Sequence, residues 1–222
     1  MSDYSLLRSR MVNNQLRTFD VTDLRIQRAF ATVPRELFVP PQHRVIAYSD
    51  EAIPLGDGPF DRVRCMMKPA TLARMIQYLE IRPEDVVLVV GAGMGYSAAI
   101  LAQLANSVIA LESDEALAER ATTELEDLGI ENVAVVTGPL PEGYPSEAPF
   151  DVILVDGAVE VSLDALTAQL KDGGRLAVVE GTGLAGRARL YTRSGDVTSG
   201  WPQFSAAAPL LPGFEKPEAF VF

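Results

Sequence analysis

The sequence contains few of the residues on which most metal sites and nucleophilic enzymes depend. Its 222 residues include one cysteine, Cys65, and one histidine, His43. A disulfide within the chain is therefore impossible, and a zinc site built from cysteine and histidine is nearly so. A catalytic triad would have to use His43, and no Gly-x-Ser-x-Gly motif accompanies that residue. The composition thus predicts no metal site and little conventional acid–base chemistry.

Long apolar runs and an excess of basic charge are also missing. No stretch approaches the ~20 consecutive apolar residues that span a bilayer, and the first residues lack a basic-then-apolar signal pattern. Asp and Glu outnumber Lys and Arg by 30 to 19, which gives a formal net charge of -11 and disfavours a general nucleic-acid binder. We expect a cytoplasmic protein with no membrane or nucleic-acid partner. The sequence does not fix the oligomeric state and slightly favours a monomer.

The chain divides into two regions with different patterns. Residues 1–68 show no regular alternation of strand and helix, and we expect two short amphipathic helices followed by an irregular connection. The second helix should begin at a cap, Asp20 or Thr22, and end before Pro34. Residues 69–222 are expected to form the main domain, with residues 1–68 packed against it as an N-terminal helical extension.

Strands and helices alternate regularly after Pro69. Five strands are expected at residues 86–90, 108–111, 133–136, 152–155 and 176–179, and the first is a continuous apolar run typical of a strand buried on both faces. Helical segments lie between them, and one is expected around residues 163–170. This alternation predicts an α/β fold with a parallel sheet and helices on both faces. The tail from residue 190 is expected to supply closing strands that run antiparallel.

A glycine-rich loop follows the first of these strands and opens a helix. Gly91, Gly93 and Gly95 let the backbone turn tightly and let a ligand approach the helix N-terminus. Glu112 ends the next strand, where an acid accepts the hydrogen bonds of a ribose. The Gly-x-Gly-x-Gly spacing looks like the S-adenosylmethionine loop of class I methyltransferases, and a nicotinamide dehydrogenase is the least favoured enzyme. A tight turn that binds nothing is the alternative.

Several segments spread over nearly the whole chain resemble one family. They are residues 8–16 (RSRMVNNQL), 33–40 (VPRELFVP), Ala47-Tyr48, 87–102 (VLVVGAGMGYSAAILA), 148–151 (APFD), 169–176 (QLKDGGRL) and the closing Pro209-Leu210. Together they resemble protein-L-isoaspartate O-methyltransferases. The glycine loop alone is common to many proteins, whereas VPRELFVP combined with it is fairly specific.

The resemblance implies a fold and a reaction. The fold is a Rossmann-like methyltransferase sheet, in which the end of the extension forms a substrate-side loop. The reaction moves a methyl group from S-adenosylmethionine to the side carboxylate of an isoaspartyl residue, which begins protein repair. The partner would be a protein or peptide carboxylate. Because a carboxylate is already ionised near pH 7, the chemistry needs no general base, and a single histidine is no obstacle.

The glycine loop and the resemblance also predict site residues. For the cofactor these are Gly91, Ala92, Gly93, Gly95, Tyr96, Glu112, Leu140 and Asp156. For the substrate they are Arg64, Cys65, Met67 and Lys68, and Arg62 adds a further positive charge that attracts an anion. The alternative for these basic residues is a solvated loop on an acidic protein. No catalytic residue is assigned.

Three positions depart from the pattern of the family. Its Thr-Ile-Ser-x-Pro motif reads Cys65-Met66-Met67-Lys68-Pro69, so a methionine, which cannot donate a hydrogen bond, replaces the serine. Val89 replaces an acid on the first strand, and Pro139 replaces the acid of a Gly-Asp-Gly segment. These departures leave two other hypotheses open. One is a non-catalytic homologue that binds a protein or small ligand in the same crevice, and the other is a methyltransferase with a less polar acceptor.

Overall fold

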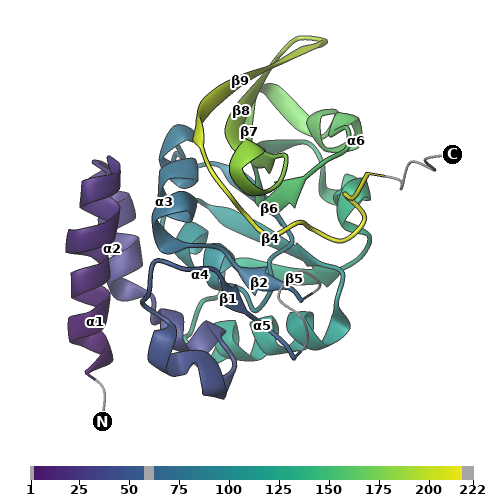
Figure 1. Cartoon of the computed structure of the whole chain (residues 1–222). Coiled ribbons are helices and arrows are strands. Elements are labelled where there is room, and N and C mark those ends of the chain that lie inside the picture. Colours follow the sequence, from purple (N-terminus) through teal and green to yellow (C-terminus); the bar gives the residue numbers. More distant parts are fainter. Residues whose placement is uncertain (1–2, 58–62, 217–222) are drawn as a thin grey trace, which may run out of the picture.

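The computed structural model describes residues 3–57 and 63–216, and a seven-stranded sheet forms its centre (Figure 1). The strand order is β5-β4-β3-β6-β7-β8-β9. The strands are β3 (Val86–Val90), β4 (Ser107–Glu112), β5 (Val133–Thr137), β6 (Phe150–Val159), β7 (Leu170–Glu180), β8 (Arg187–Ser194) and β9 (Val197–Ser205). Strands β3 to β7 run parallel, and β8 and β9 are antiparallel. The expected parallel sheet with antiparallel closing strands is thus confirmed.

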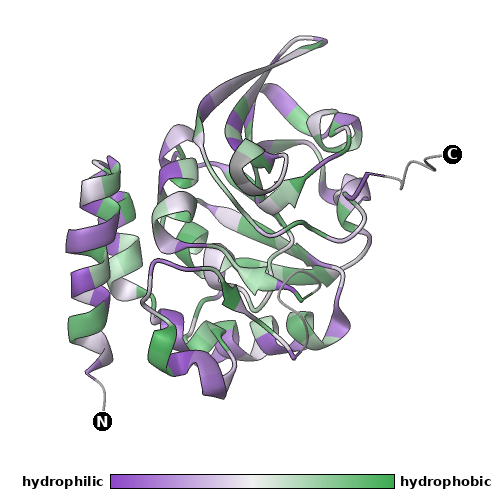
Figure 2. Ribbon diagram, viewed as in Figure 1, coloured by the Kyte–Doolittle hydropathy of each residue, from purple (hydrophilic) through white to green (hydrophobic). Residues whose placement is uncertain are grey.

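Both faces of the sheet are apolar, as Figure 2 shows for its strands. Strand β3 illustrates the period of two, because Val87 and Val89 enter one core cluster while Leu88 and Val90 enter the other. Helices α3 (Pro69–Tyr78), α4 (Tyr96–Ala102) and α5 (Glu115–Asp127) pack into the first cluster. The second cluster includes Leu166 from the short helix α6 (Asp164–Thr167). Helices therefore cover both faces, as the alternation predicts.

Two expected helix boundaries are wrong. The helix around residues 163–170 ends at Thr167, because the chain enters strand β7 at Leu170. Helix α2 (Leu24–Thr32) begins after Asp23, whose carboxylate accepts the N–H of Arg25 at 2.7 Å, and neither Asp20 nor Thr22 is its cap. Asp20 has a φ of 61°, a left-handed conformation that ends the preceding turn. The end of α2 before Pro34 agrees with the prediction.

The N-terminal extension contains two helices and a short hairpin. Helix α1 (Tyr4–Met11) continues as a π-helical turn (Val12–Leu16), and the hairpin consists of β1 (Ile53–Pro54) and β2 (Cys65–Met66). Short 3₁₀ segments lie at Arg17–Phe19, Arg35–Phe38, Pro41–Ile46, Leu140–Glu142, Pro145–Glu147 and Gly183–Ala185. In the part of the chain that the structure describes, no helix is long and apolar enough to cross a bilayer.

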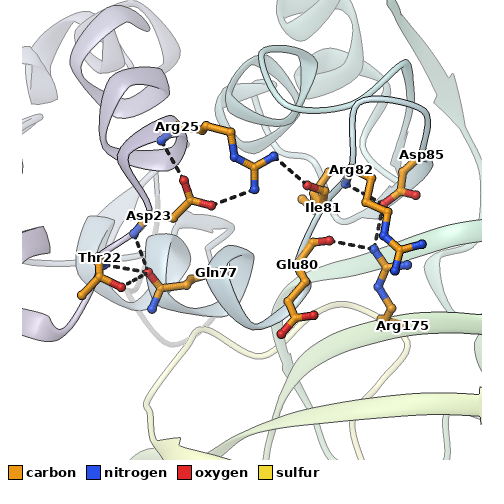
Figure 3. A network of polar contacts seen from close by, with 9 residues as sticks. All are labelled: Thr22, Asp23, Arg25, Gln77, Glu80, Ile81, Arg82, Asp85 and Arg175. Carbon is orange, nitrogen blue, oxygen red and sulfur yellow. Dashed lines mark hydrogen bonds and ion pairs between the residues drawn. The ribbon is translucent and has the colours of Figure 1, made fainter.

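A polar network fastens the extension to helix α3 and to the segment that leads into β3 (Figure 3). The side-chain oxygen of Gln77 accepts the N–H groups of Thr22 and Asp23 at 2.7 and 3.0 Å. On the sheet itself, Arg175 of β7 donates to Asp85 at 2.7 Å, and the side chain of Asp85 is 4% exposed. This buried ion pair lies at the amino end of β3, whereas the glycine loop lies at the carboxyl end of the same strand.

Candidate functional site

The glycine loop lies at the carboxyl end of β3. This strand lies between β4 and β6, so the order of the strands in the sheet reverses direction here. The N–H groups of Gly91 and Ala92 donate to the carbonyl of Leu111 at 2.9 and 3.1 Å, which ties the loop to β4. Gly95 precedes α4 with a φ of 94°, a conformation that favours glycine. Crevices that bind nucleotides form at this kind of position in open parallel sheets.

Glu112 ends β4 beside this loop, and its carboxylate is completely buried. One oxygen, Oε2, accepts the N–H of Gly93 at 2.7 Å and Nη2 of Arg64 at 2.9 Å. The other, Oε1, accepts the N–H groups of Ser113 and Asp114 at 2.8 and 3.2 Å. Burial by itself raises the pKa of Glu112, but the charge of Arg64 and these hydrogen bonds outweigh it and leave the pKa lowered. The acid is therefore an ionised partner of Arg64.

Arg64 belongs to the segment just before β2, and its side chain lies over the glycine loop. Besides Glu112, its Nη2 donates to the carbonyl of Gly91 at 3.0 Å, and its side chain is only 12% exposed. The sequence predicts that Arg64 attracts the substrate carboxylate. In the structure its guanidinium instead meets the acid that is predicted to bind the ribose of the cofactor.

Two leucines complete the cover over the loop. A Cβ atom added to Gly93 would lie 2.7 Å from Cδ1 of Leu55, and one added to Gly91 would lie 2.8 Å from Cδ2 of Leu211. The cavity left beside the loop has a volume of about 10 Å³. Sites for drug-sized ligands measure roughly 300–1,000 Å³. In this conformation the crevice therefore does not fit S-adenosylmethionine.

The small cavity brings together five of the predicted cofactor residues. Its lining includes Gly91, Ala92, Gly93, Tyr96 and Asp156. A larger groove of about 380 Å³ lies between α1 and α2, and the described residues that line it include none of the predicted site residues. We therefore place the candidate site at the glycine loop.

Asp156 is the second acid of the site. It lies within β6, directly after Val155, which pairs with Val90 at the end of β3 beside the glycine loop. Its Oδ1 is buried and has no hydrogen-bond partner among the described residues. Burial raises the pKa of Asp156 to about 6, against the opposing effects of Ser97, Arg64 and Arg35. This carboxyl group thus titrates much closer to neutral pH than an ordinary aspartate.

Arg35 is a buried cation that contacts Tyr96, one of the residues that line the cavity. The sequence does not predict its role. It lies in the VPRELFVP segment, is 0% exposed, and donates to the carbonyls of Ala47 and Met67 at 2.8 and 2.7 Å. The centroid of the Tyr96 ring lies 4.7 Å from its guanidinium carbon. The side chain of Tyr96 therefore contacts the extension. The sequence feature that could have indicated a buried role for Arg35 is its place as a charged residue within the largely apolar segment VPRELFVP.

The remaining predicted residues lie around the cavity or outside it. Cys65 and Met67 are buried, and burial raises the pKa of the Cys65 thiol to about 11, so the thiol stays protonated near neutral pH. Lys68 pairs with Glu51 at 3.1 Å. Leu140 packs into the second core cluster and is not among the residues that line the cavity. Arg62 lies outside the described residues.

The sheet order, the glycine loop and the acid at the end of the next strand define a Rossmann-like fold of the class I methyltransferase type. Residues 7–199 match the family model of protein-L-isoaspartate(D-aspartate) O-methyltransferase. The chain is 41% identical over 182 residues to a protein-L-isoaspartate O-methyltransferase of Koribacter versatilis, covering 82% of this chain and 80% of the relative. It is 39% identical over 199 residues to protein-L-isoaspartate O-methyltransferase 2 of Shewanella sediminis, covering 89% and 80%. The chain therefore belongs to the protein-L-isoaspartate O-methyltransferase family.

Solved structures show the same fold. One protein-L-isoaspartate O-methyltransferase is 27% identical with a TM-score of 0.80, and the match covers 93% of this chain and 66% of that one. A Plasmodium falciparum protein described as a putative protein-L-isoaspartate O-methyltransferase, in complex with S-adenosyl-L-homocysteine, is 17% identical with a TM-score of 0.76, covering 92% and 97%. The family uses S-adenosylmethionine. The predicted membership and fold are thus confirmed.

Proposed function

We propose that this protein transfers a methyl group from S-adenosylmethionine to the carboxylate of isoaspartyl residues in proteins or peptides. The observation that carries this proposal is family membership over residues 7–199, together with the glycine loop and Glu112 at the carboxyl edge of the sheet. The proposed cofactor residues are the glycine loop, Glu112 and Asp156. The proposed substrate side is the segment from Arg64 to Lys68.

The chemistry suits a site with little acid–base equipment. Nδ1 of His43 lies 2.9 Å from the carbonyl oxygen of Pro54, and His43 is not among the described residues that line the cavity. Because an isoaspartyl carboxylate is already ionised near pH 7, the acceptor oxygen needs no proton removed. The contribution of the protein is to align donor and acceptor and to exclude water.

The proposal predicts selective methylation of isoaspartyl peptide. Purified protein is incubated with methyl-labelled S-adenosylmethionine at millimolar concentration and a peptide that contains one isoaspartyl residue. Label should appear as a base-labile methyl ester, and the matched peptide with ordinary aspartate should stay unlabelled. Equal labelling of both peptides, or of neither, would contradict the proposed acceptor. Binding of the cofactor without transfer would favour the non-catalytic homologue or the methyltransferase with a less polar acceptor.

A further inference from the structure

The carboxylate of Glu112 is already saturated by its own chain. A carboxylate offers about four lone-pair sites on its two oxygens. Oε2 accepts from Gly93 and Arg64, and Oε1 accepts from the backbone N–H groups of Ser113 and Asp114 and from the Ser113 hydroxyl at 3.2 Å. Among the donors that the structure describes, Gly93 and Arg64 take both sites of Oε2, and the other three share the two sites of Oε1. Ribose hydroxyls have no acceptor left at Glu112 in this conformation.

Arg64 is the donor that stands apart from the others. The backbone donors belong to the glycine loop and the turn after β4, and they hold Glu112 in place at the sheet edge. Arg64 comes from the hairpin of the extension, 48 positions away in sequence. Its guanidinium also lies beside Gly91, where an added Cβ would meet Nη2 at 3.2 Å. The guanidinium of Arg64 therefore occupies both the space over Gly91 and a lone pair of Oε2 of Glu112.

Arg64 and Leu55 are parts of the same hairpin. The N–H of Leu55 donates to the carbonyl of Arg64 at 2.8 Å, and the neighbouring residues Pro54 and Cys65 pair as β1 and β2. Leu55 covers Gly93, and Arg64 covers Gly91. Because a backbone hydrogen bond joins them, a shift of one strand displaces both covering groups together.

We infer that Arg64 competes with the cofactor for Glu112 and so determines how tightly the cofactor binds. The cofactor binds when the guanidinium leaves the carboxylate, and its observed affinity is the intrinsic affinity multiplied by the fraction of molecules in which Arg64 is withdrawn. This inference rests on the proposed function for the identity of the ligand. It assigns to Arg64 a role in cofactor affinity, in addition to its proposed place on the substrate side.

The test is the affinity of Arg64→Met for S-adenosyl-L-homocysteine, measured by isothermal titration calorimetry against the parent protein. Methionine keeps an unbranched apolar chain but removes the guanidinium. We expect binding at least about ten-fold tighter, since a hydrogen bond to a charged group contributes about 1.5–3 kcal/mol. The rise in melting temperature at saturating ligand should also be larger for the variant than for the parent.

Arg175→Met is the matched control. It removes a similarly buried arginine from its ion pair with Asp85, at the opposite edge of the sheet (Figure 3). It should lower thermal stability and leave the dissociation constant unchanged. If Arg64→Met is too unstable to titrate, Arg64→Lys keeps a cation beside Glu112 but lacks the planar fork. Its dissociation constant should lie below that of the parent.

The outcomes separate this inference from the proposed function. Unchanged or weaker binding by Arg64→Met, or equal tightening by Arg175→Met, would overturn the competition. An equal or larger dissociation constant for Arg64→Lys would do the same. Tighter binding by Arg64→Met without methylation of the isoaspartyl peptide supports the competition and contradicts the proposed acceptor. The two results are independent because calorimetry measures cofactor binding, whereas the methylation assay tests the acceptor.

Discussion

Replacing Arg35 with alanine is expected to lower the free energy of unfolding by about 3–5 kcal/mol. The side chain is completely buried and donates to the carbonyls of Ala47 and Met67. Its removal leaves both carbonyls without their charged donor, at about 1–3 kcal/mol each, and opens a cavity against the ring of Tyr96. Urea denaturation followed by circular dichroism measures the change.

A second arginine of the extension provides the control for this prediction. Arg28 lies on α2 and is exposed, so Arg28→Ala should change the free energy of unfolding by no more than about 0.5 kcal/mol. Arg35→Lys retains the charge without the planar fork and should fall between the two. A loss below about 1 kcal/mol for Arg35→Ala would show that the two carbonyls find other donors.

The sheet was predictable because its signal is local and repeated. The run at residues 86–90 is apolar at every position, as a strand buried on both faces requires, and β3 spans these residues. The glycine loop and Glu112 followed from their places after β3 and at the end of β4. These features depend on a few neighbouring residues, and sequence alone therefore reaches them.

The helix ends were less predictable because several residues compete for the same role. Asp20, Thr22 and Asp23 all have side chains that cap helices. The left-handed backbone at Asp20 makes it the end of one turn, and Asp23 becomes the cap of α2. Composition does not distinguish these candidates, since the decision depends on how the two helices pack.

The cover over the glycine loop depends on contacts between distant segments. Arg64 meets Glu112 only because the hairpin β1–β2 places it there, and Leu211 arrives from the far end of the chain to lie over Gly91. No periodicity or motif near these residues predicts such a contact. The predicted assignment of Arg64, Cys65, Met67 and Lys68 to the substrate stays a prediction, as does the domain boundary at residues 68 and 69.

Asp156→Asn is expected to stabilise the protein in a way that depends on pH. Burial, against the opposing effects of Ser97, Arg64 and Arg35, raises the pKa of this carboxyl group from 3.8 to about 6 in the folded protein. Between these values the folded state holds a proton that the unfolded state has released, so the free energy of unfolding falls as pH rises through this window. The neutral amide of asparagine does not titrate there. The stability of the variant relative to the parent should therefore rise by about 2–3 kcal/mol between pH 4 and pH 7.5.

The comparison across pH isolates the charge of Asp156 from the other effects of the substitution. An asparagine amide also needs hydrogen-bond partners, but that cost is the same at both pH values and cancels in the difference. Asp50→Asn, at an exposed aspartate, provides the matched control and should show no such rise. Chemical denaturation of both variants and the parent at pH 4, 5, 6 and 7.5 supplies the measurement. A constant offset for Asp156→Asn at all four values would mean that this carboxyl group ionises as easily in the folded protein as in the unfolded chain. The burial of this carboxyl group beside the glycine loop would then not penalise its charged form.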